Sequence, residues 1–204
     1  MHGVAGHGGR ALPASSQGHG GSILIRKSIG IIATTCAAYF LLCRLNTALF
    51  SSLGYSDGVD WVFLPSGLRL AFVLVFVEEG ALGIMLASAL VGGLYHFSDD
   101  VVTALGAGFI SGFAPWLARL VCLDRFKLDV NLRGLTAVTL IKVSLVFSAL
   151  SPVLHQLWFS WRGRTEDFIS STAVMAVGDL VGTLLVMYSV KMLAQLVPAP
   201  GTGG

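Results

Sequence analysis

Charged residues are scarce in this sequence. Asp, Glu, Lys and Arg together make up 12% of the 204 residues, about half of their usual share in a soluble domain. The net charge at pH 7 is only +2 and the basic residues are scattered, so the chain lacks the clustered basic surface of a nucleic-acid-binding protein. Hydrophobic residues make up 54% of the chain. This combination excludes an ordinary soluble domain and is typical of an integral membrane protein.

The sequence also lacks the usual patterns of metal sites and hydrolytic enzymes. Its three cysteines, Cys36, Cys43 and Cys122, have no C-x-x-C spacing and are interpreted as small packing residues. No H-E-x-x-H motif is present. Ser66 has no histidine in the core of any expected span to act as its base, and Asp179 has no second acid in a span. We therefore expect no enzymatic activity, no metal site and no cofactor.

Both ends of the chain are rich in small and polar residues. Residues 1–22 contain mainly Gly, Ser, Ala and His without hydrophobic periodicity, which predicts a disordered cytoplasmic tail. His2, His7 and His19 of this tail do not have the spacing of a defined metal site. Residues 195–204 are rich in Pro and Gly and predict a second disordered tail.

Between the tails, residues 23–194 are expected to form one all-α membrane domain. Its apolar runs are long enough to cross a bilayer as helices, and they predict a polytopic protein with six transmembrane helices. The expected spans are residues 28–50, 62–77, 81–97, 101–122, 134–154 and 168–193. The Glu-Glu-Gly sequence at 78–80 predicts a tight turn, which would make the second and third spans antiparallel neighbours.

The positions of the basic residues predict the orientation of the spans. Arg26 and Lys27 precede the first span, and the loop 119–133 is the most basic in the chain, so both are expected in the cytoplasm. The turn 51–60 carries two aspartates and no basic residue, which suits the outer face. We therefore predict a multi-pass protein of the inner (plasma) membrane, surrounded by lipid, with both termini in the cytoplasm.

Three ionisable residues, Arg69, Lys142 and Asp179, lie inside expected spans. A carboxylate near the bilayer centre costs roughly 2.5 to 3.5 kcal/mol, so Asp179 should have a partner. At a rise of 1.5 Å per residue, the depths of Arg69 and Asp179 in their spans differ by roughly 6 Å, which an arginine side chain can cover. Arg69 is therefore the expected partner of Asp179, and Lys142 is a second possible partner. These charges predict either a polar site for a small ligand or ion, or a neutralised triad that only fixes helix packing.

Small residues accompany these charges. Gly178 and Gly182 flank Asp179 in a small-xxx-small arrangement, which lets another backbone approach closely. A proline is tolerated at the head of the second span, because its missing N–H would have no helical partner there. The supporting residues of the predicted site are Pro65, Ser66, Gly67, Gly178 and Gly182.

Two short motifs resemble the type-one membrane-associated sensor domain (the MASE family). They are Leu-Pro-Ser-Gly-Leu at 64–68, opening the second span, and Gly-Asp-Leu-Val-Gly at 178–182 in the last span. Such domains usually have more spans and precede a diguanylate cyclase, phosphodiesterase or histidine kinase domain. The resemblance implies a stand-alone sensor-like module, with an unidentified small ligand, that acts through a separate membrane or cytoplasmic protein.

Two other functions are compatible with the sequence. Small six-span subunits of vitamin importers of the energy-coupling factor type have a similar size and bind a small solute. Alternatively, the glycines in the fourth and sixth spans could pack against a larger membrane complex, which would make the chain an accessory or scaffold subunit.

Overall fold

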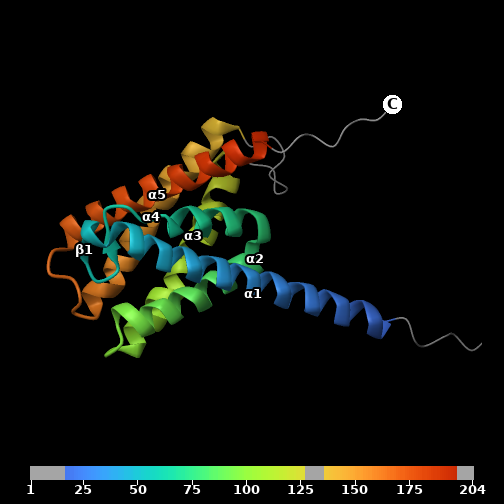
Figure 1. The fold of residues 1–204 in the computed structure, drawn as a ribbon, viewed down its shortest axis with the longest axis horizontal. Helices are drawn as coiled ribbons and strands as arrows, with labels where there is room; N and C mark the ends of the chain where they lie inside the picture. Colours follow the sequence, from blue (N-terminus) through green and yellow to red (C-terminus); the bar gives the residue numbers. More distant parts are fainter. Residues whose placement is uncertain (1–16, 127–135, 197–204) are drawn as a thin grey trace, which may run out of the picture.

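The computed structural model describes residues 17–126 and 136–196, and these residues are almost entirely helical (Figure 1). The helices are α1 (Gln17–Phe50), α2 (Pro65–Val91), α3 (Val101–Phe126), α4 (Ala137–Trp161) and α5 (Phe168–Leu196), with short helical turns at η1 (Ser51–Leu53) and η2 (Gly92–His96). A small antiparallel hairpin, β1 (Gly54–Ser56) and β2 (Val59–Asp60), lies between α1 and α2 in the sequence. Apart from this hairpin the described residues contain no strand, so the predicted all-α fold is confirmed.

The predicted tails lie largely outside the described residues. α1 begins at Gln17, inside the segment predicted as the first tail, and α5 ends at Leu196, inside the second. The remaining residues of both tails, 1–16 and 197–204, are not described.

Five helical stretches in the described part of the chain are long and apolar enough to cross a membrane, whereas the sequence predicted six spans. They are Ser22–Leu53, Pro65–His96, Val101–Leu123, Ala137–Trp161 and Phe168–Ser189. The difference arises because the second and third predicted spans belong to one stretch, which contains α2 and η2.

α2 is bent back on itself at Val77, which has non-helical dihedral angles (φ 47°, ψ −105°). A methyl group added to Gly80 would clash with the carbonyl oxygen of Phe72, although a straight helix would separate these residues by about 12 Å. Figure 1 shows the chain reversing near the α2 label. We call residues 65–76 the first arm and 78–91 the second arm. The reversal thus occurs at Val77, and the predicted turn residues 78–80 are helical.

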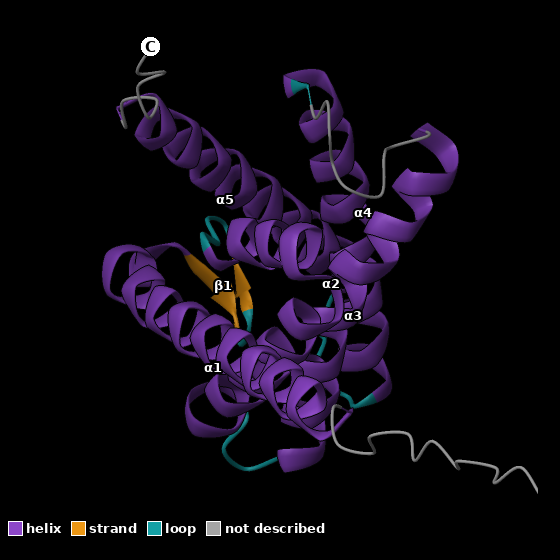
Figure 2. Ribbon diagram, turned by 90° about the vertical axis from the view of Figure 1, so that its right-hand side faces the viewer, coloured by secondary structure: helices purple, strands orange, loops and turns teal. Residues whose placement is uncertain are grey.

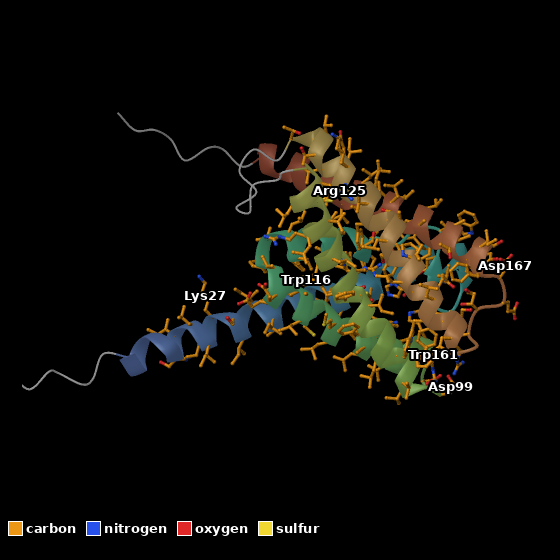
Figure 3. The ribbon with its side chains drawn as sticks, turned by 180° about the vertical axis from the view of Figure 1, so that it is seen from behind. Lys27, Asp99, Trp116, Arg125, Trp161 and Asp167 are labelled. Carbon is orange, nitrogen blue, oxygen red and sulfur yellow. The ribbon has the colours of Figure 1, made fainter. Side chains whose placement is uncertain are left out.

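α1 packs against both arms of α2, and its contacts show that the arms run in opposite directions. The Leu64 N–H, just before the first arm, donates to the Asn46 side chain near the end of α1. Gly83 at the start of the second arm lies against Thr35, and Tyr95 beyond its end lies against Phe40. The beginning of α1 extends beyond the other helices, as the position of Lys27 in Figure 3 shows.

The hairpin between α1 and α2 packs against α5 at one end of the helical bundle (Figure 2). Val59 is only 1% exposed and forms a small apolar cluster with Val174 and Met175 of α5. This contact holds the hairpin, and the extended residues that follow it, over the interior of the bundle.

Candidate functional site

Arg69 on the first arm and Asp179 on α5 form an ion pair in the interior of the bundle. Arg69 Nη2 lies 2.8 Å from Asp179 Oδ1, and the side chains are 1% and 0% exposed. Because a buried charge is costly without a partner, this pairing neutralises both groups. Lys142, the other predicted partner, has an exposed side chain on α4 and does not share this buried environment.

Ser66 connects the start of α2 to α5 beside the ion pair. Its Oγ lies 2.7 Å from the carbonyl oxygen of Phe63 and 2.8 Å from that of Asp179, and 3.1 Å from Thr183 Oγ1. Pro65 is the first residue of α2, where a proline lacks only an N–H that has no helical partner. A side chain at Gly67 would clash with Val186, so this glycine lets α2 approach α5 closely.

Gly178 and Gly182 make room for the extended backbone that enters α2. A methyl group at Gly178 would clash with the carbonyl oxygen of Asp60, and one at Gly182 with that of Phe63. The Phe63 N–H donates to the carbonyl oxygen of Gly178 at 3.2 Å. The close backbone approach predicted from these glycines therefore involves the segment 60–64 and not the body of another helix.

The segment 60–64 is not helical, so its backbone needs partners within the protein. Asn46 Oδ1 accepts the Leu64 N–H at 2.9 Å, and the Leu53 carbonyl accepts the Trp61 N–H at 3.1 Å. Asn46 is 3% exposed. Sequence reasoning missed this residue, although an asparagine within an apolar helix is a recognisable signal.

A polar cavity of about 60 Å³ lies beside the ion pair, beneath the hairpin. The polar residues that line it include Tyr39, Asn46, Asp60, Arg69, Ser88 and His155. This volume accommodates about four water molecules. The cavity therefore places a small polar space directly against a buried guanidinium.

A chain of side-chain hydrogen bonds forms part of the cavity wall. Ser88 Oγ donates to Ser111 Oγ at 2.8 Å, and Ser111 Oγ lies 3.2 Å from His155 Nε2. His155 Nδ1 lies 2.9 Å from the carbonyl oxygen of Ser151, which can only accept. This geometry assigns the proton of a neutral His155 to Nδ1, so that Nε2 accepts from Ser111.

The position of His155 corrects the sequence interpretation. The fifth span was expected to end at residue 154, which left His155 outside it, and no histidine was expected in the core of a span. α4 instead continues to Trp161, and His155 is 3% exposed within the bundle. A histidine therefore does lie in the core, and His96, in η2, also lines the cavity.

Several buried polar atoms near the ion pair lack a hydrogen-bond partner among the described residues. They are Arg69 Nε, Asp179 Oδ2 and Ser151 Oγ. The Arg69 guanidinium also lies 5.0 Å from the centre of the Phe63 ring. Because buried polar groups are normally satisfied, this region has unused capacity for hydrogen bonding.

Asp60 is a second charged residue on the cavity wall. It lies on β2, outside the helices, and no ion pair to it occurs in the part of the chain that the structure describes. Burial raises the pKa of its carboxyl group to about 6. At neutral pH Asp60 is therefore largely ionised, at an energetic cost that a positively charged group could offset.

The hairpin end of the bundle also carries a partly exposed ion-pair network. Arg162 Nη2 lies 3.0 Å from Asp100 Oδ1, and Arg164 Nη2 lies 2.6 Å from Asp99 Oδ2. Asp100 also accepts the Thr103 N–H at 3.0 Å, which caps α3. Hydrogen bonds from Thr103, followed by Arg162, hold the pKa of Asp100 well below its usual value. This network fixes the connection between α2 and α3 to the end of α4.

Among the residues that the structure describes, no group of three His, Cys, Asp or Glu side chains is positioned to hold a metal ion. Comparisons of the chain with protein-family models, with curated proteins and with solved structures find no match.

Proposed function

We propose that this chain is a sensor-like module of the inner (plasma) membrane that binds a small molecule in its polar cavity and acts through a separate protein. The observation that carries this proposal is the position of Arg69. Its guanidinium is buried, forms one hydrogen bond to Asp179, and lines the cavity. Ionisable groups inside membrane spans usually mark functional sites, and this pair retains unused hydrogen-bonding capacity.

The proposed topology has six crossings with both termini in the cytoplasm. The first arm and the extended segment 60–64 before it make one crossing, and the second arm and η2 make the next. The bend at Val77 then lies at the cytoplasmic face. The distribution of charges supports this orientation. In Figure 3, Lys27 and Arg125 lie towards one end of the molecule, whereas Asp99 and Asp167 lie towards the opposite end. Basic residues favour the cytoplasmic side.

A change at Arg69 can reach the cytoplasmic face through the first arm. The arm leads from Arg69 to the bend at Val77, and Glu79 just beyond the bend accepts a hydrogen bond from Ser28 of α1 at 2.9 Å. Ligand binding that shifts the first arm would therefore alter the packing of α1 at its cytoplasmic half. The resemblance to MASE domains, which precede signalling enzymes, supports a protein partner at this face.

The size of the cavity favours this function over vitamin import. Sites for drug-sized ligands usually have volumes of about 300 to 1,000 Å³. The cavity of about 60 Å³ is much smaller, so a vitamin would not fit in this conformation. A very small polar molecule would fit.

The test is purification of the tagged protein from its native membrane in mild detergent, followed by mass spectrometry of retained proteins and small molecules. We expect a protein partner at fixed stoichiometry and a small molecule that the wild type retains and Asp179→Asn loses. Lys142→Gln, which removes an exposed charge of α4, is the matched control and should retain both. If Asp179→Asn and Arg69→Ala both behave as the wild type, the ligand-binding function is wrong.

A further inference from the structure

The cavity wall carries two groups of opposite charge that have unused hydrogen-bonding capacity, Arg69 and Asp60. Arg69 has five N–H donors, of which one bonds to Asp179, and its buried Nε has no hydrogen-bond partner among the described residues. Asp60 presents a carboxylate that no described residue pairs with. Arg69, Asp60 and Cys43 all line this cavity.

Asn46 adds hydrogen-bond donors to the wall of the same cavity. Its Oδ1 accepts the Leu64 N–H, so the rest of its side-chain amide is an NH₂ group with two donors. Asn46 is 3% exposed and lines the cavity. A guanidinium and an amide NH₂ together suit the two oxygens of a carboxylate.

The serine chain of the cavity wall offers an acceptor. Ser88 donates its proton to Ser111, which in turn bonds to His155, so the remaining capacity of Ser88 is its lone pairs. Lone pairs of a hydroxyl and the oxygens of a carboxylate such as Asp60 both suit an ammonium group. The cavity therefore combines groups that recognise an anion with groups that recognise a cation.

The total charge distinguishes among possible ligands. Arg69 and Asp179 neutralise each other, and Asp60 adds one negative charge. A simple anion would bring a second negative charge into a poorly solvated space, and a simple cation would approach the Arg69 guanidinium. A ligand with one charge of each sign avoids both penalties. The volume of about 60 Å³ limits it to roughly four or five non-hydrogen atoms.

We propose that the cavity binds a small zwitterionic amino acid of about the size of glycine. Its carboxylate is held by Arg69 and Asn46, and its ammonium group by Asp60 and Ser88. This proposal rests on the ligand-binding function proposed above and specifies the class of ligand.

The test is a calorimetric titration and thermal melting of the purified full-length protein in detergent, with five probes. Glycine and alanine are zwitterions, acetate and methylammonium each carry one of the two charges, and acetamide is neutral. We expect glycine to bind and to raise the melting temperature, alanine to bind more weakly, and the other three to have no effect. If acetate or methylammonium binds as tightly as glycine, or if no zwitterion binds, the proposal is wrong.

A pair of variants on the hairpin assigns the ammonium site. Asp60→Asn should weaken glycine binding at least about tenfold, because it removes the negative partner without changing the size of the side chain. Asp57→Asn is the matched control, since Asp57 is an exposed aspartate of the same hairpin, and it should bind glycine as the wild type does. Unchanged glycine affinity in a folded Asp60→Asn variant would contradict the proposal. Binding of a singly charged probe would overturn the zwitterion proposal but would still support the ligand-binding function. The purification experiment with Asp179→Asn tests that function separately.

Discussion

Arg69 Nη2 reaches Asp179 Oδ1 over 2.8 Å, although 110 residues separate the two in the chain. This one hydrogen bond joins the first arm of α2 to the middle of α5, between side chains that are almost completely buried. Neither residue could keep its charge at this position without the other. The pair is therefore a requirement for stable packing, and one of its members, Arg69, is also part of the cavity wall.

Removal of one member of this pair should destabilise the protein more than removal of both. Arg69→Leu and Asp179→Leu each leave an uncompensated buried charge, at a cost of about 3 to 5 kcal/mol. The double variant leaves none, so its loss of stability should be much smaller than the sum of the two. Unfolding in mixed detergent micelles measures this coupling. Additive losses would show that the ion pair does not contribute as the structure implies.

The glycine pair of α5 provides a second test, because the backbone of the segment 60–64 lies against it. Gly182→Ala forces a methyl group against the carbonyl oxygen of Phe63 and should cost about 1 to 3 kcal/mol by overpacking. Gly30→Ala on α1 is the matched control, since nothing lies within 4 Å of its added methyl group. It should leave the melting temperature unchanged or raise it, because alanine favours helix. Equal effects of the two substitutions would contradict the close approach.

The sequence could predict the parts of the site that have local signals. A charge in a long apolar run is conspicuous, so Arg69, Asp179 and the flanking glycines were identifiable, and the depth argument paired the first two. Lys142 gave the same signal, but its position on the exposed face of α4 depends on the rotation of the helix. The expected span from Gly134 to Leu154 is apolar on most of its faces, so the sequence did not determine that rotation.

The remaining parts of the site depend on contacts between distant segments. Ser88, Ser111 and His155 come from three helices, and serine within an apolar helix gives little indication of its partner. The end of α4 was placed too early because polar and aromatic residues follow Leu154, yet the helix continues and buries His155. The position of the reversal was also missed by one residue, because valine is not a residue expected at positive φ.

The backbone of Val77 can be tested directly. A β-branched residue at φ 47° is strained, and glycine adopts such a conformation readily. Val77→Gly should therefore be neutral or should raise the melting temperature. Val75→Gly is the control in the helical part of the first arm, where Val75 is 63% exposed, and it should lose up to about 1 kcal/mol. Greater destabilisation by Val77→Gly than by Val75→Gly would show that the bend does not have this geometry.

Asp60 should make stability depend on pH in a defined direction. Its folded-state pKa of about 6 lies above the usual value of 3.8, so the folded protein binds this proton more tightly than the unfolded chain. Stability should therefore decrease as the pH rises from about 4 to about 6, and remain lower above that range. Asp60→Asn should remove this decrease and stabilise the ligand-free protein at pH 7.5 relative to wild type. Melting curves of both proteins at pH 5 and 7.5 measure the difference, and an identical pH dependence would contradict it.

The reversal at Val77 determines how many times the chain crosses the membrane. If α2 crosses twice, Asp57 before it and Asp99 after it lie on the same side; if it crosses once, they lie on opposite sides. Single cysteines at these positions, introduced after replacement of the three native cysteines, can be labelled with a membrane-impermeant maleimide. Both aspartates are exposed, so both sites are accessible to the reagent.

We expect cysteines at Asp57 and Asp99 to react in intact cells, because both lie on the outer face in the proposed topology. A cysteine at Glu78, which is exposed at the bend, should react only after the membrane is permeabilised. Glu166, in the connection between α4 and α5, is the control for the outer face and should react with the first two. Reaction of Asp57 but not Asp99 in intact cells would mean a single crossing by α2. It would also contradict the cavity, because Arg69 of the first arm and Ser88 of the second arm could not then lie at the same depth in the membrane.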